Sequence, residues 1–188
     1  MTSLIVLLGA VAVLAMWVIG VYNRLIGLRN QKENGWRQID VQLKRRHDLI
    51  PNLVNTVRGA MEFERDTLTA VMEARAKAMA ATGPAEAGRT EGALTQALGR
   101  LFALAENYPQ LRANENVKML QEELASTENK VGFARQFYND IATKYNIARE
   151  VFPANMVAGM FGFGAAELFQ VTDDAERQVP AVDLSMKT

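Results

Sequence analysis

His47 is the only histidine among the 188 residues, so it is the first candidate for a catalytic base or a metal ligand. A di-iron helical bundle requires Glu-x-x-His pairs, but the residue three positions before His47 is Lys44. The chain has no cysteine, which excludes thiolate metal sites, disulfide bonds and cysteine nucleophiles. We therefore interpret His47 as a structural residue on a helix face beside Lys44, Arg46 and Asp48, and we expect no bound metal or cofactor.

Glycine and basic residues also lack a pattern typical of phosphate or nucleic-acid binding. Gly159, Gly162 and Gly164 follow no predicted strand, and neither G-x-x-x-x-G-K-[ST] nor G-x-G-x-x-G occurs in the chain. The 21 Lys and Arg residues are balanced by 21 Asp and Glu residues, so net charge gives no support for a nucleic-acid partner. The sequence predicts a protein that is not an enzyme and that binds no nucleic acid.

The N-terminal segment has the composition of a membrane-spanning helix. No side chain in residues 1–23 is charged, and residues 4–21 are almost entirely apolar. About 20 apolar residues, at about 1.5 Å each, cross a hydrocarbon core about 30 Å thick. Trp17 and Tyr22 lie toward the end of this stretch, where aromatic side chains suit a headgroup layer. A cleaved signal peptide is the alternative, but no Lys or Arg precedes the apolar stretch, so we expect a retained anchor over residues 1–23.

Charges beyond the anchor predict its orientation. All nearby Lys and Arg residues follow the span, which places the N-terminus outside the cell and the chain from Arg24 onward in the cytoplasm. Arg24, Arg29 and Lys32 are close enough to the span to contact anionic lipid headgroups. The basic run at residues 44–46 lies about 30 Å beyond the end of the span along a helix, and we expect it to be a solvated face paired with Asp40 and Asp48.

Hydrophobic periodicity predicts an all-α fold, in which an elongated antiparallel bundle of three or four coiled-coil-like helices continues from the anchor. Residues 24–169 form this bundle, with a loop at residues 83–90. Pro51 is expected to kink the first helix without ending it. The acidic residues 170–188 contain few large apolar side chains and are expected to be loosely held. The helices are predicted at about 24–81, 90–108, 114–151 and, as a short fourth helix, 154–161.

The third predicted helix has the most regular pattern. Residues at steps of three and four form a seam over more than four heptads, as in a coiled coil: Val117, Leu120, Leu124, Thr127, Val131, Ala134, Tyr138, Ile141, Tyr145 and Ala148. Phe133 and Phe137 fall beside this seam, so one partner helix cannot cover all of its apolar surface. Either the second helix or a second copy of the chain covers the remainder, and we interpret Phe133 and Phe137 as candidate partner or oligomer contacts.

Residues 152–163 form a segment rich in Met, Phe and Gly. It could insert into a membrane interface, dock on a partner, or cap the open end of the bundle, and the cap is the purely structural alternative. As candidate partner or oligomer contacts in this segment we take Met156, Met160, Phe161 and Phe163.

Several blocks of sequence, in this order, resemble the LemA family of bacterial membrane proteins over nearly the whole chain. They are Tyr22-Asn23, the run from Val41 to Val54, Tyr108-Pro109-Gln110-Leu111, the run from Leu124 to Lys130, Tyr138-Asn139 with Asn146, Phe152-Pro153, and Met160-Phe161-Gly162-Phe163. The resemblance implies a single-pass anchor in the bacterial inner (plasma) membrane and no established enzymatic activity. It also implies an association with membrane organisation, including magnetosome formation, and with neighbouring membrane proteases.

These observations lead to two functional hypotheses. The first is a membrane-anchored scaffold that forms homo-oligomers and organises or remodels the membrane. The second is a monomeric adaptor or regulatory subunit that presents its bundle to another membrane protein, such as a membrane protease.

Overall fold

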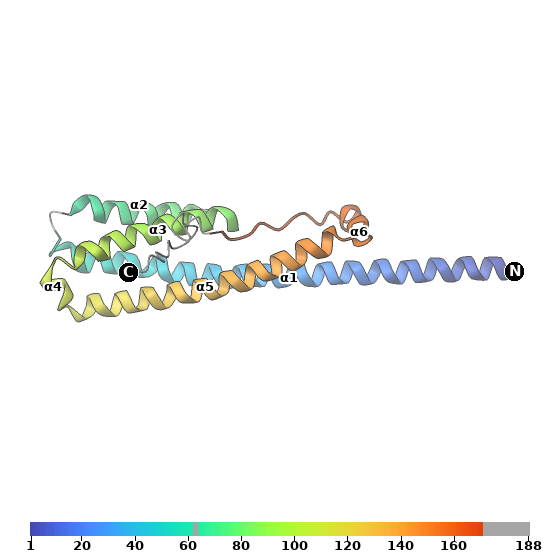
Figure 1. The fold of residues 1–188 in the computed structure, drawn as a ribbon, viewed down its shortest axis with the longest axis horizontal. Coiled ribbons are helices and arrows are strands. Elements are labelled where there is room, and N and C mark those ends of the chain that lie inside the picture. The colour runs from blue at the N-terminus through green and yellow to red at the C-terminus, as the bar shows by residue number, and fades with distance from the viewer. Residues whose placement is uncertain (62–63, 171–188) are drawn as a thin grey trace, which may run out of the picture.

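A computed structural model describes residues 1–61 and 64–170. These residues form six helices and no strands, which confirms the all-α prediction. Figure 1 shows an elongated molecule in which α1 runs along the whole length and the other helices gather beside its C-terminal part. The acidic segment predicted at 170–188 lies, except for Gln170, outside the described residues. The helices are α1 (Thr2–Arg58), α2 (Arg65–Ala80), α3 (Pro84–Ala105), α4 (Pro109–Arg112), α5 (Glu115–Glu150) and α6 (Ala154–Met160).

The N-terminal part of α1 extends beyond the bundle. Within the described residues, α1 is the helix that is long and apolar enough to cross a membrane, and no other part of residues 1–61 and 64–170 buries that stretch. The same helix then continues without a break into the bundle and passes through Pro51. The bundle is therefore attached to the apolar stretch through continuous helix rather than through a linker.

The structure corrects the predicted first helix of the bundle. The helix expected over residues 24–81 is two helices, because α1 ends at Arg58 and α2 begins at Arg65. The helices α2 and α3 form a hairpin beside the distal half of α1 (Figure 1). This return lets the apolar stripe of α2, which a straight rod would expose to water, pack against α1 and α3.

The loop predicted at residues 83–90 is also wrong, because α3 already begins at Pro84. Proline suits the first turn of a helix, where its missing N–H has no intrahelical partner in any case. Gly83 precedes it with a φ of 83°, a left-handed conformation that glycine adopts without steric cost. The turn between α2 and α3 is therefore much shorter than the composition of the segment indicated.

The seam predicted for the third helix corresponds to α5 and is largely buried, mainly against α1. Asn114 caps α5, since its side chain accepts hydrogen bonds from the backbone N–H groups of Asn116 and Val117. The core has two parts. At the distal end, α1, α2, α3 and α5 share one cluster that includes Ile50, Leu53, Leu94 and Leu98. Nearer the anchor, α1 and α5 share a second cluster with α6 and residues 163–169.

Candidate interaction surfaces

In the basic run at residues 44–46, Lys44 and Arg45 are exposed as predicted, but Arg46 is buried and belongs to an ionic cluster. Arg46 Nη1 lies 2.8 Å from Glu91 Oε2, and both side chains are almost fully buried. Arg46 Nη2 donates to Thr95 Oγ1 at 2.9 Å and forms an ion pair with Glu128 at 2.8 Å. His47 Nε2 lies 2.6 Å from the other Glu91 oxygen, Oε1.

This cluster corrects two expectations from the sequence. The face of α1 that carries His47 is not beside Asp48 in solvent but buried, and His47 lies against Glu91 of α3. Arg45 and Arg46 do not pair with Asp40 or Asp48, because Arg45 binds Glu123 of α5 and Arg46 binds Glu91. The cluster joins three helices, because Arg46 of α1 pairs with Glu91 of α3 and with Glu128 of α5. Buried ion pairs of this kind add little net stability but are costly to break, which favours a single register.

A second set of polar contacts holds an extended segment, Phe163–Phe169, against α5. We call this segment the strap. The Asn139 side chain donates to the carbonyl oxygen of Phe169 and accepts from its N–H, at 3.0 and 2.9 Å. Asn146 makes the same pair of bonds with Ala166, at 2.9 and 2.8 Å. The strap backbone thus finds its hydrogen-bond partners in asparagine amides rather than in a sheet.

The spacing of these two asparagines matches the geometry of the strap. Asn139 and Asn146 are seven residues apart, which is about 10.5 Å along a helix. Ala166 and Phe169 are three residues apart, which is about 10 Å in an extended chain. The residue before each asparagine is a tyrosine that also donates to the strap, Tyr138 to Glu167 O at 2.7 Å and Tyr145 to Gly164 O at 3.0 Å. The signal was therefore present in the sequence as a Tyr-Asn pair repeated after seven residues.

Burial changes the acidity of both tyrosines. Burial raises the pKa of Tyr138 to about 12, and the nearby negative charge of Glu167 adds to this shift. Burial also raises the pKa of Tyr145. Both hydroxyl groups are therefore neutral donors at physiological pH. Their role in the structure is to hold the strap.

Two of the three residues predicted to contact lipid headgroups also contact aromatic rings of the chain. The Arg29 guanidinium lies 5.6 Å from the centre of the Phe163 ring, and Lys32 Nζ lies 5.4 Å from the centre of the Tyr145 ring. Arg24 is exposed, close to the end of the apolar stretch of α1. Cation–π contacts leave the outer side of each cation accessible, so headgroup contact stays a prediction for all three.

Phe133 and Phe137 lie at an exposed groove between α1 and α5. Phe133 is 74% exposed, and Val41 of α1 is also exposed. The Phe137 ring packs over Gly35, where an added Cβ would lie 3.4 Å from both the ring and the Tyr138 backbone. These residues border a groove of about 550 Å³. We call the exposed surface of Val41, Phe133 and Phe137 the seam patch.

The residues singled out in 152–163 divide into two groups. Met156, Met160 and Phe161 are exposed, but Phe163 is only 7% exposed and belongs to the core beside the anchor. The prediction of Phe163 as a surface contact is therefore wrong. Its ring instead lies 5.7 Å from the Tyr22 ring of α1.

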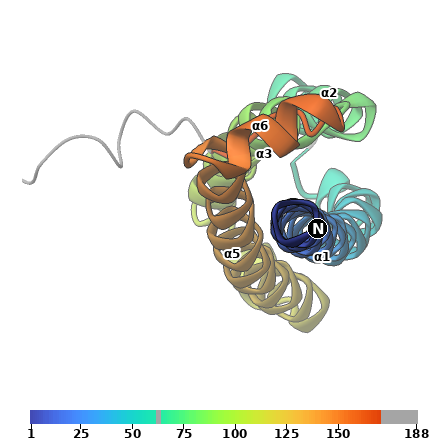
Figure 2. The same cartoon turned by 90° about the vertical axis from the view of Figure 1, so that its right-hand side faces the viewer.

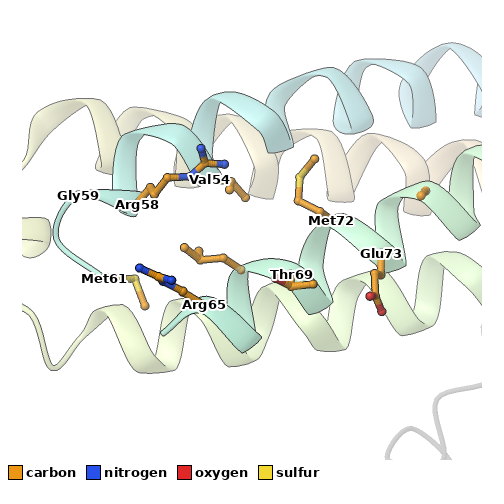
Figure 3. Close-up of a pocket in the computed structure, with 10 residues that line it drawn as sticks. Val54, Arg58, Gly59, Met61, Arg65, Thr69, Met72 and Glu73 are labelled. Atoms are coloured by element: carbon orange, nitrogen blue, oxygen red, sulfur yellow. The ribbon is translucent and has the colours of Figure 1, made fainter. Parts of the chain in front are cut away.

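A larger groove of about 740 Å³ lies between α1 and α2 at the distal end of the bundle. Figure 3 shows Met61 and Met72 in this region, with the guanidinium groups of Arg58 and Arg65 near its distal part. Because α2 and α3 pack more closely on each other than α2 packs on α1, the hairpin leaves this side open. The sequence did not indicate this groove, since it depends on the return of the chain after Arg58. Within residues 1–61 and 64–170, no group of three or more His, Asp and Glu side chains is placed to hold a metal ion.

The chain is similar in sequence to several known proteins. Magnetosome protein MamQ 2 of Paramagnetospirillum magneticum is 36% identical over 80 residues, which cover 43% of this chain and 29% of the relative. Magnetosome protein MamQ of Magnetospirillum gryphiswaldense is 23% identical over 174 residues, covering 79% of this chain and 64% of the relative. The chain thus spans less than two thirds of the length of these magnetosome relatives. Protein LemA of Metamycoplasma hominis is 26% identical over 159 residues, covering 82% of this chain and 71% of the relative.

None of these names is that of an enzyme, and together with the apolar part of α1 they support a membrane-associated protein. The LemA family itself matches residues 35–184, a range that contains the ionic cluster, the seam patch and the strap. The resemblance noted in the sequence is therefore confirmed, and the chain belongs to the LemA family.

Proposed function

We propose that this protein is a non-enzymatic, membrane-anchored scaffold whose helical bundles self-associate side by side and thereby organise or remodel the membrane. The continuous helix α1 supports this role, because it transmits the position of the anchor directly to the bundle. Relatives named magnetosome proteins also support a role at a membrane.

The observation that carries the proposal is the seam patch. Phe133 is a large aromatic residue in the middle of α5 with most of its surface exposed. Together with Val41 and Phe137 it borders an apolar groove whose rim carries Arg37 and Lys130. An apolar surface rimmed by charged residues is typical of a protein contact.

Anchoring in one membrane favours contact between two copies of this patch. Val41 lies 20 residues beyond Val21, or about 30 Å from the end of the span along a straight helix. Copies with the same orientation therefore present their seam patches at the same height. The anchors also raise the effective concentration of the bundles, so weak contacts between them become sufficient for assembly.

We further propose that the anchor spans the bacterial inner membrane with the N-terminus outside and the bundle in the cytoplasm. The basic residues that follow the apolar stretch support this orientation. A cytoplasmic reporter fused after Thr188 is expected to be active, and an exported phosphatase fused at the same place is expected to be inactive. An active phosphatase would reverse the orientation.

The alternative is a monomeric adaptor that presents the bundle to another membrane protein. The groove between α1 and α2 favours it, because a large, mostly apolar groove at the distal end is accessible to a partner (Figure 3). The two roles differ in the size of the purified particle. A scaffold is a high-order homo-oligomer, whereas an adaptor is a monomer before it meets its partner.

The test uses the full-length protein in mild detergent, with its mass measured by light scattering after subtraction of the detergent. We expect a high-order oligomer that Phe133→Glu disperses without loss of helix content, because this side chain is exposed and not part of the core. Met119→Glu is the matched control, since Met119 is an exposed apolar residue of α5 outside the patch. A monomeric wild-type particle would favour the adaptor. If the Phe133→Glu particle has the same mass as the wild-type particle, the seam patch is not the contact between copies.

A further inference from the structure

The chain around α6 has a surface that is unusual for a protein exposed to water. From Val151 to Ala166 no residue is charged. Phe152, Met156 and Met160 occur at intervals of four, and their exposed fractions are 81%, 65% and 78%. The opposite side of α6 is also apolar, but Val157 and Ala158 there are buried in the core. Large apolar side chains that gather on an exposed and uncharged surface indicate a contact with something other than water.

The position of α6 indicates what that contact is. The Phe161 ring, directly after α6, lies 4.9 Å from the ring of Tyr22 in α1. All residues of α1 before Val21, apart from the half-buried Val18, are exposed along the apolar stretch. The side chains that follow α6 therefore touch α1 within about one helical turn of the point where it leaves the membrane.

The direction of α6, like its position, is consistent with contact with the membrane surface. Figure 1 places α6 at the end of the bundle from which the uncovered part of α1 emerges. Figure 2, viewed from that end, shows α6 in the foreground, lying across the direction of α1. If α1 crosses the bilayer, a helix in this orientation lies along the membrane surface.

We propose that α6 is an interfacial helix that, together with the preceding Phe152, inserts Met156 and Met160 into one leaflet of the bilayer, beside the anchor of the same chain. Short amphipathic helices lie in this way with their apolar side chains about 5–10 Å into the boundary between headgroups and acyl chains. The inference rests on the membrane span of α1 that is part of the proposed function, and it is independent of self-association.

Basic residues around α6 suit the same location. Arg24 is exposed near the end of the span, and Arg29 lies over the Phe163 ring at 5.6 Å. Arg149, near the end of α5, donates to the carbonyl oxygen of Phe163 at 3.3 Å. Arg24 and Arg29 belong to α1 and Arg149 belongs to α5, the two helices beside α6. Their guanidinium groups can contact anionic headgroups while the Met and Phe side chains enter the acyl region. A rod that is held by a transmembrane helix and by a second helix in the membrane plane has a defined angle to the bilayer.

The experiment uses single cysteine variants of the full chain, which contains no cysteine of its own. Met160→Cys carries an environment-sensitive fluorophore, and the protein is placed in vesicles of phosphatidylcholine and phosphatidylglycerol that contain quenchers at shallow or deep positions of the acyl chain. Leu14→Cys, within the apolar stretch, is the control for a label inside the membrane. Met119→Cys, at an exposed methionine far from the anchor, is the control for a label in water.

We expect the shallow quencher to reduce the fluorescence at Met160 several-fold more than at Met119, and more than the deep quencher does. Leu14 is expected to be quenched most strongly by the deep quencher.

If Leu14 is quenched while Met160 behaves like Met119, the interfacial role of α6 is overturned and the anchor remains. If the Met160 label is shielded from water but not quenched by lipid, and the shielding depends on protein density, a second copy covers α6 and the inference is wrong. If Leu14 is not quenched, the span fails and the inference fails with it.

Discussion

Arg75 donates from its Nε to the backbone carbonyl oxygen of His47 at 2.7 Å. This carbonyl would normally accept a hydrogen bond from the residue four positions later in the helix, but that residue is Pro51, which has no N–H. Arg75 of α2 supplies the missing donor. The proline that interrupts the hydrogen bonding of α1 therefore also creates an attachment point for α2.

The role of Arg75 predicts a coupling between two substitutions. Arg75→Met leaves the partly buried carbonyl of His47 without a donor and is expected to destabilise the protein by about 1–2 kcal/mol. In a Pro51→Ala background the same substitution is expected to cost much less, because the N–H of residue 51 can then reach that carbonyl. A double-mutant cycle measures the difference from urea unfolding of the full-length protein in detergent, followed by circular dichroism. An equal cost of Arg75→Met in both backgrounds would contradict the explanation.

A second prediction compares a buried ion pair with an exposed one. Glu91→Ala removes the buried carboxylate that contacts Arg46 and His47. It is expected to destabilise the protein by about 3 kcal/mol, the lower end of the cost of breaking a buried pair, because Arg46 keeps its ion pair with Glu128. Glu123→Ala removes the exposed pair with Arg45, at 2.6 Å, and is expected to cost about 1 kcal/mol or less. Thermal unfolding of both variants under identical conditions tests the ranking. Similar costs for the two variants would mean that the buried cluster does not restrain the helices.

A third prediction concerns the strap and its local stability, which hydrogen exchange measures, rather than the free energy of global unfolding. Asn139→Ala removes both side-chain hydrogen bonds to Phe169, and Asn146→Ala removes both bonds to Ala166. Each variant is expected to increase hydrogen exchange of the backbone amide that it releases, with little change in exchange within α5. Asn129→Ala is the control, because Asn129 is an exposed asparagine of the same helix. Unchanged exchange at Phe169 in Asn139→Ala would show that packing alone holds the strap.

Tyr138 predicts a pH dependence of stability. Its pKa is raised from 10.0 to about 12 in the folded protein, mainly by burial. The protonated hydroxyl is therefore favoured by folding, and its contribution is complete below about pH 10 and is lost as the pH rises toward about 12. The difference in unfolding free energy between wild type and Tyr138→Phe is expected to shrink between about pH 10 and about pH 12. A difference that stays constant over this range would contradict the shifted pKa.

Local features of the sequence determined which segment is an apolar helix and which face of α5 is buried. The apolar stretch at residues 4–21 is a property of composition, and it appears in the structure as the uncovered part of α1. The seam of α5 is a property of spacing, and all ten of its residues are buried or half-buried as predicted. Both signals depend on neighbours within one or two helical turns, so they can be interpreted before the fold is known.

The pairing of the helices was decided only by the tertiary structure. A periodic stripe specifies which face of a helix is buried but not which helix covers it. The stripe through Leu53, Val57 and Leu68 was therefore equally compatible with a straight rod and with the return that follows Arg58. The weak signal was Gly59, a residue that helices also tolerate in their interior.

The ionic cluster was not predicted for the same reason: the sequence does not show which helix covers the buried face of α1. Arg46 and His47 lie three and four positions after Leu43, on the buried stripe of α1, but polar residues at such positions are normally interpreted as solvated. Their burial is stable only because Glu91 of α3 lies within hydrogen-bond distance, 44 residues from His47 in the chain. The sequence contained the residue types and their faces, whereas the folding of α2 and α3 back onto α1 brought the opposite charges together.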